Sequence, residues 1–415
     1  MRISIFFLLL FCVIVIPGAY YNITQSASYG QGSYSKGALL SVSIVGLIYI
    51  LKYKSISFEK AYNSFFTILI LIFVVSLFSM LFSDWFEFNR FFLSYFLLSF
   101  SMIGSIFFVI MSKNVDDEDV YNHISTIFYI ILLDAIIFFI SRRLYGDQGP
   151  WLYLFPEISH FSLIFLPLLL FKVLTFKKNI HAYMAILISL IISIDSLTLL
   201  CGTILIMLIY SIKKTFFLFL IPISLLIAIY GLEPEILELG RPGSPVNQLL
   251  DRLDFEDPNN FSTLVFLSGW ERAYLNFFDY NFLGVGFNQL GFEGKIGFYQ
   301  NKIAALGQPN LNLNDGGSLA PKLISELGIL GIITVFIYLI SLIKIVYQVK
   351  KYKLIYSYLD TFYISIFIMS FVFIFLRGSG YFSPSMFLLL SAIVYINKRN
   401  SNEYNIFLKR GISKL

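Results

Sequence analysis

Long apolar runs separated by short polar clusters divide nearly all of this chain. A helix that crosses a membrane needs about 20 consecutive, mainly apolar residues, and most of the runs approach that length. The pattern therefore predicts an all-α fold, a polytopic transmembrane helical bundle of about twelve spans. The predicted spans lie near 3–18, 37–52, 62–83, 91–111, 121–140, 160–176, 181–196, 199–212, 215–231, 319–343, 354–376 and 383–397.

Two parts of this pattern have an alternative interpretation. The first run follows Arg2 and resembles a signal peptide, but eleven runs follow it, so we expect an uncleaved first helix. Residues 181–212 are few for two spans, and as one helix they would extend about 48 Å, beyond a hydrocarbon core of about 30 Å. Polar residues between Ser193 and Thr203 favour a hairpin of two short helices over one long helix.

Residues 232–318 form the longest polar segment, between the ninth and tenth predicted spans. This large loop divides the chain into N-terminal membrane helices (1–231), the loop itself, and C-terminal membrane helices with a tail (319–415). Within the loop, residues 261–279 predict an amphipathic helix, with Ser262 as its N-cap. Its expected shared face is formed by Leu264, Leu267, Glu271, Leu275 and Phe278.

Composition supports the membrane class, since 58% of residues are hydrophobic, only 13% are charged, and mean hydropathy is +0.79. A soluble domain has about 25% charged residues. Cys12 and Cys201 lie in apolar runs, which excludes a disulfide framework. We find no sequence motif for a metal, a cofactor or a nucleic-acid partner.

Basic residues predict the orientation, because cytoplasmic segments are rich in Lys and Arg. With both termini inside, 16 of the 20 lysines fall on inner segments, whereas seven of the ten arginines fall outside. The outer arginines are Arg90, Arg142, Arg143, Arg241, Arg252, Arg272 and Arg377. Arginine binds phosphate or carboxylate bidentately, so this bias favours an anionic ligand. Chance and ordinary loop ion pairs are the alternative.

Ionisable residues near the outer face supply further candidates. The loop carries five cations and eleven anions. This acidic balance is consistent with a site in which isolated arginines bind a phosphorylated ligand and carboxylates bind sugars. It is equally consistent with an ordinary solvated surface. Lys322 and Glu326 are spaced i, i+4 just inside a span, which predicts either a functional pair or a self-neutralising ion pair near the interface. His160, at the outer mouth of the sixth span, is a candidate site residue.

Three motifs together resemble the O-antigen polymerase and ligase superfamily of polytopic membrane glycosyltransferases. Arg272, in Ser-Gly-Trp-Glu-Arg, precedes the Gly284-Val285-Gly286 turn. The tenth span carries Glu-x-Gly-x-x-Gly from Glu326 to Gly331, and a large outer loop occurs late in the chain. The motifs cover residues 268–331, and the remainder matches only in layout.

The resemblance implies an enzyme of the bacterial inner membrane whose active site faces the periplasm. Its donor and acceptor would be oligosaccharides linked through diphosphate to a polyprenyl lipid, with no cofactor. A chain-length regulator and a flippase are candidate partners besides membrane lipid. Arg272 would contact the diphosphate. The other expected substrate-binding residues are Arg90, Arg142, Arg143, Arg377, His160, Gly284 and Gly286.

The expected reaction is attack by a sugar hydroxyl at the donor's anomeric carbon, with polyprenyl diphosphate leaving. Asp315 is the first candidate to accept the hydroxyl proton and Glu326 the second. Ligase-type members have a His-Asn pair where this chain has Gly317 and Ser318, so the repeat-unit polymerase is favoured over the ligase. A lipid-linked oligosaccharide flippase is the third alternative, though transporters usually have two similar halves.

Overall fold

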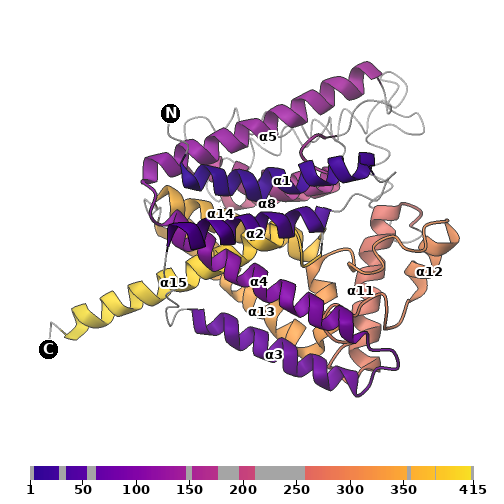
Figure 1. Ribbon diagram of the computed structural model, residues 1–415. Coiled ribbons are helices and arrows are strands. Elements are labelled where there is room, and N and C mark those ends of the chain that lie inside the picture. The colour runs from indigo at the N-terminus through magenta and orange to yellow at the C-terminus, as the bar shows by residue number, and fades with distance from the viewer. Residues whose placement is uncertain are drawn as a thin grey trace.

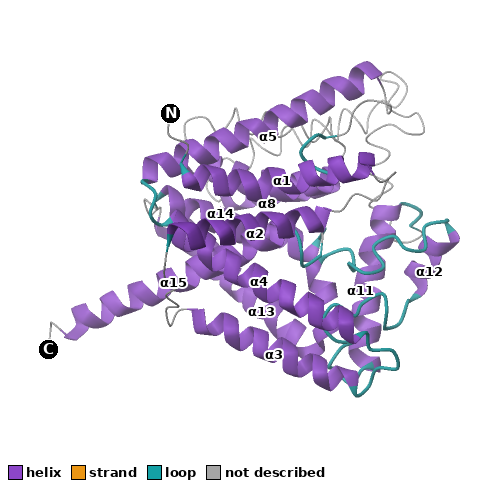
Figure 2. Ribbon diagram, viewed as in Figure 1, coloured by secondary structure: helices purple, strands orange, loops and turns teal. Residues whose placement is uncertain are grey.

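A computed structural model of the chain describes residues 4–27, 34–53, 62–145, 152–175, 196–210, 258–352, 357–378 and 380–412. The regular structure of these residues is helical (Figure 2), apart from one isolated bridge between Leu290 and Glu293. The helices are α1 (Ile5–Ala27), α2 (Tyr34–Lys52), α3 (Asn63–Met80), α4 (Phe88–Ser112), α5 (Asp117–Tyr145), α6 (Ile158–Thr175), α8 (Leu197–Tyr210), α11 (Phe261–Asp279), α12 (Phe298–Ala305), α13 (Leu319–Tyr352), α14 (Tyr358–Phe375) and α15 (Pro384–Ile412).

The apolar helices run back and forth beside one another and form a bundle (Figure 1). α1 packs on α2, α2 on α4, α6 on α14, and α15 on both α4 and α14. Their shared interior is filled by large apolar side chains, among them Phe6, Phe108, Phe165 and Phe362, each almost fully buried. Many other apolar side chains on these helices are exposed, as expected where the solvent is lipid.

Seven described helices are long and apolar enough to cross a membrane. They are residues 5–25, 34–52, 88–112, 117–138, 158–175, 319–350 and 358–375. The protein is thus a multi-pass membrane protein whose described part is helical, as predicted. The number of about twelve spans stays a prediction, because residues 215–231 and nearly all of 181–196 lie outside the described residues.

Two predicted spans correspond to shorter apolar helices, within α3 and α8. α8 begins at Leu197, and the Ser196 hydroxyl accepts a hydrogen bond from the Leu199 amide at 3.2 Å. This helix start falls in the polar cluster where the sequence predicts a break. It therefore argues against one continuous helix through residues 181–212, whereas the hairpin stays a prediction because its first helix lies outside the described residues.

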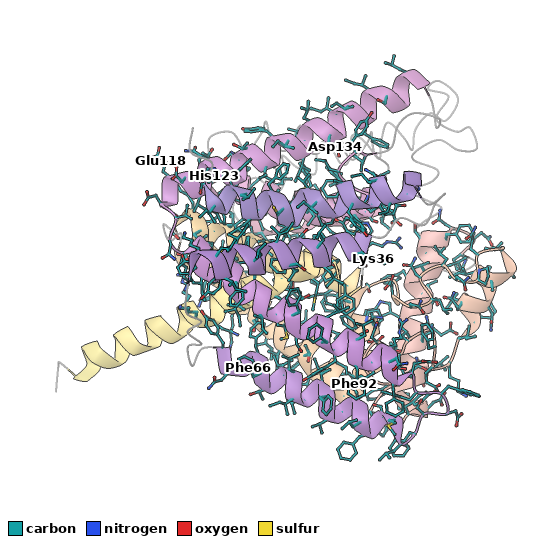
Figure 3. The ribbon with its side chains drawn as sticks, in the orientation of Figure 1. Lys36, Phe66, Phe92, Glu118, His123 and Asp134 are labelled. Carbon is teal, nitrogen blue, oxygen red and sulfur yellow. The ribbon has the colours of Figure 1, made fainter. Side chains whose placement is uncertain are left out.

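The two ends of the bundle contain different parts of the chain. α11 and α12 lie at one end, whereas the start of α1 and the end of α15 lie at the other (Figure 1). Glu118 and His123 lie at the end opposite to Lys36 (Figure 3). This arrangement matches the predicted topology, in which the loop and the termini are on opposite faces; which face is periplasmic stays a prediction.

Cysteine labelling checks this topology. We expect an impermeant thiol reagent to label Asn301→Cys in whole cells and Glu118→Cys only after lysis, in a background lacking Cys12 and Cys201. Both positions are exposed, one on α12 and one at the start of α5. Labelling of Glu118→Cys but not Asn301→Cys in whole cells would reverse the orientation and remove the site from the periplasm.

Candidate functional site

α11 is the helix that carries Arg272, and its residues match the predicted range of 261–279. The predicted cap is wrong: Asn260 is the N-cap, and its side chain accepts a hydrogen bond from the Ser262 amide at 2.9 Å. Asn and Ser are both good N-caps, so these two residues, which are two positions apart, were equivalent candidates in the sequence, and local backbone geometry decides between them.

The predicted apolar face of α11 is also wrong, because Leu264 is its one fully buried member and Phe278 is 51% exposed. Apart from Leu264 and Val265, the buried face consists of small or polar residues. Gly269 belongs to it, and a Cβ there would lie only 2.1 Å from the Gly316 carbonyl oxygen. Asn276 donates to the Ser325 hydroxyl at 2.6 Å. Close approach of the backbones and polar contacts with α13 and the turn before it therefore decide which face of α11 is buried, and the spacing of its apolar residues does not.

α13 is broken at Gly328, which has a φ of 53° that favours glycine. The chain after α11 pairs with this break. The Val285 amide donates to the Ser325 carbonyl at 3.0 Å, and the Gly286 amide donates to the Glu326 carbonyl at 2.8 Å. The Ile329 amide in turn donates to the Phe282 carbonyl at 2.8 Å.

The predicted turn at Gly284–Gly286 is therefore present, with a positive φ at both glycines. A Cβ on Gly284 would lie 2.6 Å from the backbone of Glu326. The turn fixes the loop against α13, and this contact accounts for Gly284, whereas a Cβ on Gly286 would lie 2.7 Å from the Phe86 ring. A contact of these glycines with substrate stays a prediction.

Glu326 is completely buried, and its carboxylate accepts four hydrogen bonds or ion-pair contacts. Lys322 lies 2.9 Å away as the predicted i, i+4 pair, and the Tyr381 hydroxyl donates at 2.7 Å. The Asn288 and Leu290 amides donate at 2.9 and 3.4 Å. Burial and the Glu326 charge raise the pKa of Tyr381, so its hydroxyl stays protonated as a donor. Glu326 thus holds the loop, α13 and the turn before α15 together.

Arg272 is 1% exposed and reaches from α11 toward the polar turn before α13. One guanidinium nitrogen, Nη1, donates to the Leu313 carbonyl at 2.6 Å, while the buried Nε has no partner. Among the described residues, no carboxylate lies within 4 Å of the guanidinium. Burial lowers its pKa to about 10 against the opposing charge of Glu326, so Arg272 is still protonated at neutral pH. The result is a buried cation with unused hydrogen-bond capacity.

Asp315 lies in the exposed part of the same turn, beside the segment that precedes α15. The Gly378 amide donates to the Gly317 carbonyl at 2.8 Å, and a Cβ on Gly380 would lie 2.8 Å from an Asp315 carboxylate oxygen. Asp315 is close enough for its charge to act on both Arg90 and His160. Three predicted site residues therefore lie near one another.

Arg377 joins this group through Glu157, with a separation of 3.3 Å between guanidinium and carboxylate. Burial raises the pKa of Glu157, but the charges of His160 and Arg377 outweigh burial and the net shift is downward. His160 stacks on Tyr34 with ring centroids 4.7 Å apart, and its buried Nδ1 has no hydrogen-bond partner.

Arg90, near the start of α4, contacts the loop from the opposite side. Its Nε donates to the Asn288 carbonyl at 2.5 Å, and its guanidinium lies over the Phe292 ring, 4.0 Å from the centroid. The backbone of Arg142 and Arg143 belongs to the last turns of α5, but their side chains lie outside the described residues. The structure thus brings six of the predicted site residues close enough for their charges to interact, namely Arg90, Arg272, Arg377, His160, Asp315 and Glu326.

Sequence reasoning missed Glu157 and Tyr381, which hold Arg377 and Glu326 in place. Neither residue lies in a recognisable motif, and both partners are distant in the chain. Within the described residues, no group of three His, Cys, Asp or Glu side chains is suited to hold a metal ion. Comparisons with known protein families, curated proteins and solved structures found no match for this chain.

Proposed function

We propose that this protein polymerises lipid-linked oligosaccharide repeat units into O-antigen polysaccharide, on the periplasmic face of the bacterial inner membrane. The observation that carries the proposal is Arg272, a buried guanidinium with an unpartnered Nε and no carboxylate within 4 Å among the described residues. A buried charge is costly unless it is paired. A diphosphate would supply the missing anion and accept the unused hydrogen bonds.

The proposed reaction needs cations where negative charge develops. As the bond from the anomeric carbon to the diphosphate oxygen breaks, the leaving polyprenyl diphosphate gains charge, which preorganised cations stabilise. Arg272 donates to the Leu313 carbonyl in the turn before α13, and Arg90 on α4 donates to the Asn288 carbonyl. Arg377 lies in the turn after α14, where it pairs with Glu157. These arginines serve as electrostatic stabilisers in this scheme.

The attacking sugar hydroxyl loses a proton, and in this proposal Asp315 accepts it. Asp315 is exposed, and its carboxylate accepts no hydrogen bond within the described part of the chain. Glu326 is buried and already has four partners. We therefore keep Asp315 as the first candidate for the base and assign Glu326 a positioning role.

A lipopolysaccharide gel from a strain lacking this protein tests the proposed function. Core bearing a single repeat unit is the result expected for loss of a polymerase, and restoring the gene should restore the ladder. Bare core would instead indicate a ligase. Accumulation of repeat units that are not translocated would indicate a flippase, and either result would contradict the proposal.

Asp315→Asn tests the base, because asparagine keeps the size of the side chain but removes its basicity. We expect polymer formation to fall by about 10²–10⁴-fold, the typical contribution of general base catalysis. The measurement is polymer produced per unit of immunoblotted protein. Asn314→Asp, one residue earlier and also exposed, is a matched control that should not rescue Asp315→Asn. Normal polymer from Asp315→Asn would eliminate Asp315 as the base.

A further inference from the structure

The outer face of α11 carries aromatic side chains that no other described element covers. Tyr274 is 66% exposed, Phe278 is 51% exposed, and Phe282, just after the helix, is 48% exposed. The half-buried Phe277 joins them, and neighbouring rings have centroids 4.9–5.7 Å apart. We refer to Tyr274, Phe277, Phe278 and Phe282 as the aromatic cluster.

The aromatic cluster is continuous with the lipid-facing side of α13. The Phe282 carbonyl accepts a hydrogen bond from the Ile329 amide at 2.8 Å. From that point α13 exposes Ile329, Ile332, Ile333 and Phe336. The α13 span contains the most apolar stretch of the seven candidate spans in the described residues, and only 22% of that stretch is buried. An exposed apolar surface on such a span faces lipid.

The contact also lies within the α13 span and not at its start. Ile329 is ten residues after Leu319, where α13 begins, and it directly follows the break at Gly328. Phe282 is therefore held against the apolar part of this candidate span.

The neighbouring α3 supports the same placement. The Ser79 hydroxyl, near the end of α3, is 3.2 Å from the Leu283 carbonyl and donates to it. The residues that follow α3, including Leu81, Phe82 and Trp85, are exposed by 69%, 48% and 78%. Tryptophan and other aromatic side chains concentrate at membrane interfaces. The aromatic cluster is thus flanked on both sides by surfaces typical of lipid contact.

The orientation of α11 completes the argument. In Figure 1, α11 runs across the end of the bundle, whereas the spans run along it. A helix with this orientation lies in the plane of the membrane surface. Arg272 is on its buried side and the aromatic cluster is on its exposed side.

We propose that the aromatic cluster inserts into the lipid leaflet on the α11 side, so that α11 is an interfacial helix anchored among acyl chains. The consequence is that Arg272 is fixed at headgroup depth by the same helix. The cluster contains no basic residue, so the contact is with acyl chains rather than with anionic headgroups. This inference concerns placement in the membrane and does not depend on the proposed polymerase activity.

Site-directed spin labelling of the full-length protein in liposomes tests the inference. Single cysteines replace Tyr274, Phe278 or Phe282 in a background lacking Cys12 and Cys201. We expect a nitroxide at each position to collide severalfold more often with oxygen, which dissolves in acyl chains, than with a water-soluble nickel complex. Three positions are used so that one poorly folded variant does not decide the result.

The matched control is a nitroxide at Phe298, an aromatic residue on α12 that is 66% exposed but remote from α13. It should collide preferentially with the nickel complex. Cluster labels that behave like the Phe298 label would place the cluster in water and overturn the inference. Exclusion of both reagents from the cluster would show that protein covers it, and would also overturn the inference.

Discussion

Replacing Arg272 with alanine is expected to abolish long polysaccharide chains while the protein still inserts into the membrane at its normal level. A hydrogen bond to a charged group contributes about 1.5–3 kcal/mol, or roughly 10–150-fold per contact. The loss should be larger here, because the charge on the leaving diphosphate grows toward the transition state.

Arg272→Lys should leave at most a trace of long chains. Lysine can keep one hydrogen bond to the Leu313 carbonyl, but it lacks the planar fork that binds a phosphate through two nitrogens. The measurement is the length of the polymer ladder relative to immunoblotted protein in a deletion strain.

Arg399→Lys is the matched control, because Arg399 is 3.4 Å from Asp360 in an ion pair at the opposite end of the bundle. This variant should give a full ladder. If Arg272→Lys also gives a full ladder, only positive charge is needed at that position. If Arg272→Ala does so, Arg272 has no part in the mechanism.

The second large effect concerns the buried pair of Lys322 and Glu326. Removing one partner of a buried ion pair typically costs about 3–5 kcal/mol, because the other charge is left uncompensated. We therefore expect Glu326→Gln and Lys322→Met each to lower the melting temperature strongly. The double variant should recover much of this loss, because it buries no lone charge.

The double variant also separates two possible roles of Glu326, which are positioning of the loop and action as the catalytic base. If Glu326 positions the loop, the double variant should regain polymer formation together with stability. If Glu326 is the catalytic base, the double variant will be stable but inactive. The two measurements are the melting temperature in detergent and the polymer ladder, both in the same preparation. A stable, inactive double variant would overturn the positioning role.

The sequence predicted those features that depend on local periodicity. Apolar runs located the helices of the bundle, and i, i+4 spacing located the Lys322–Glu326 pair. The bounds of α11 were also predicted, because a polar cap precedes the helix and a glycine turn follows it. Each of these patterns is formed by residues that lie close together in the sequence.

Features that depend on distant contacts were not predictable. The break at Gly328 is stabilised by residues 282–286, some forty residues earlier in the chain. Glu326 receives its donors from Asn288 and from Tyr381, 38 and 55 residues away. The face of α11 was misassigned for the same reason, since polar contacts with α13 and the turn before it decide which side is buried.

The most direct test of the proposed function uses purified protein in liposomes with a polyprenyl-diphosphate-linked repeat unit as donor and acceptor. The prediction is a ladder of lipid-linked polymers, with one free polyprenyl diphosphate released for each bond formed, and neither product from Arg272→Ala. Movement of the unchanged substrate across the bilayer, with no ladder and no released polyprenyl diphosphate, would contradict the proposal that this protein is a polymerase.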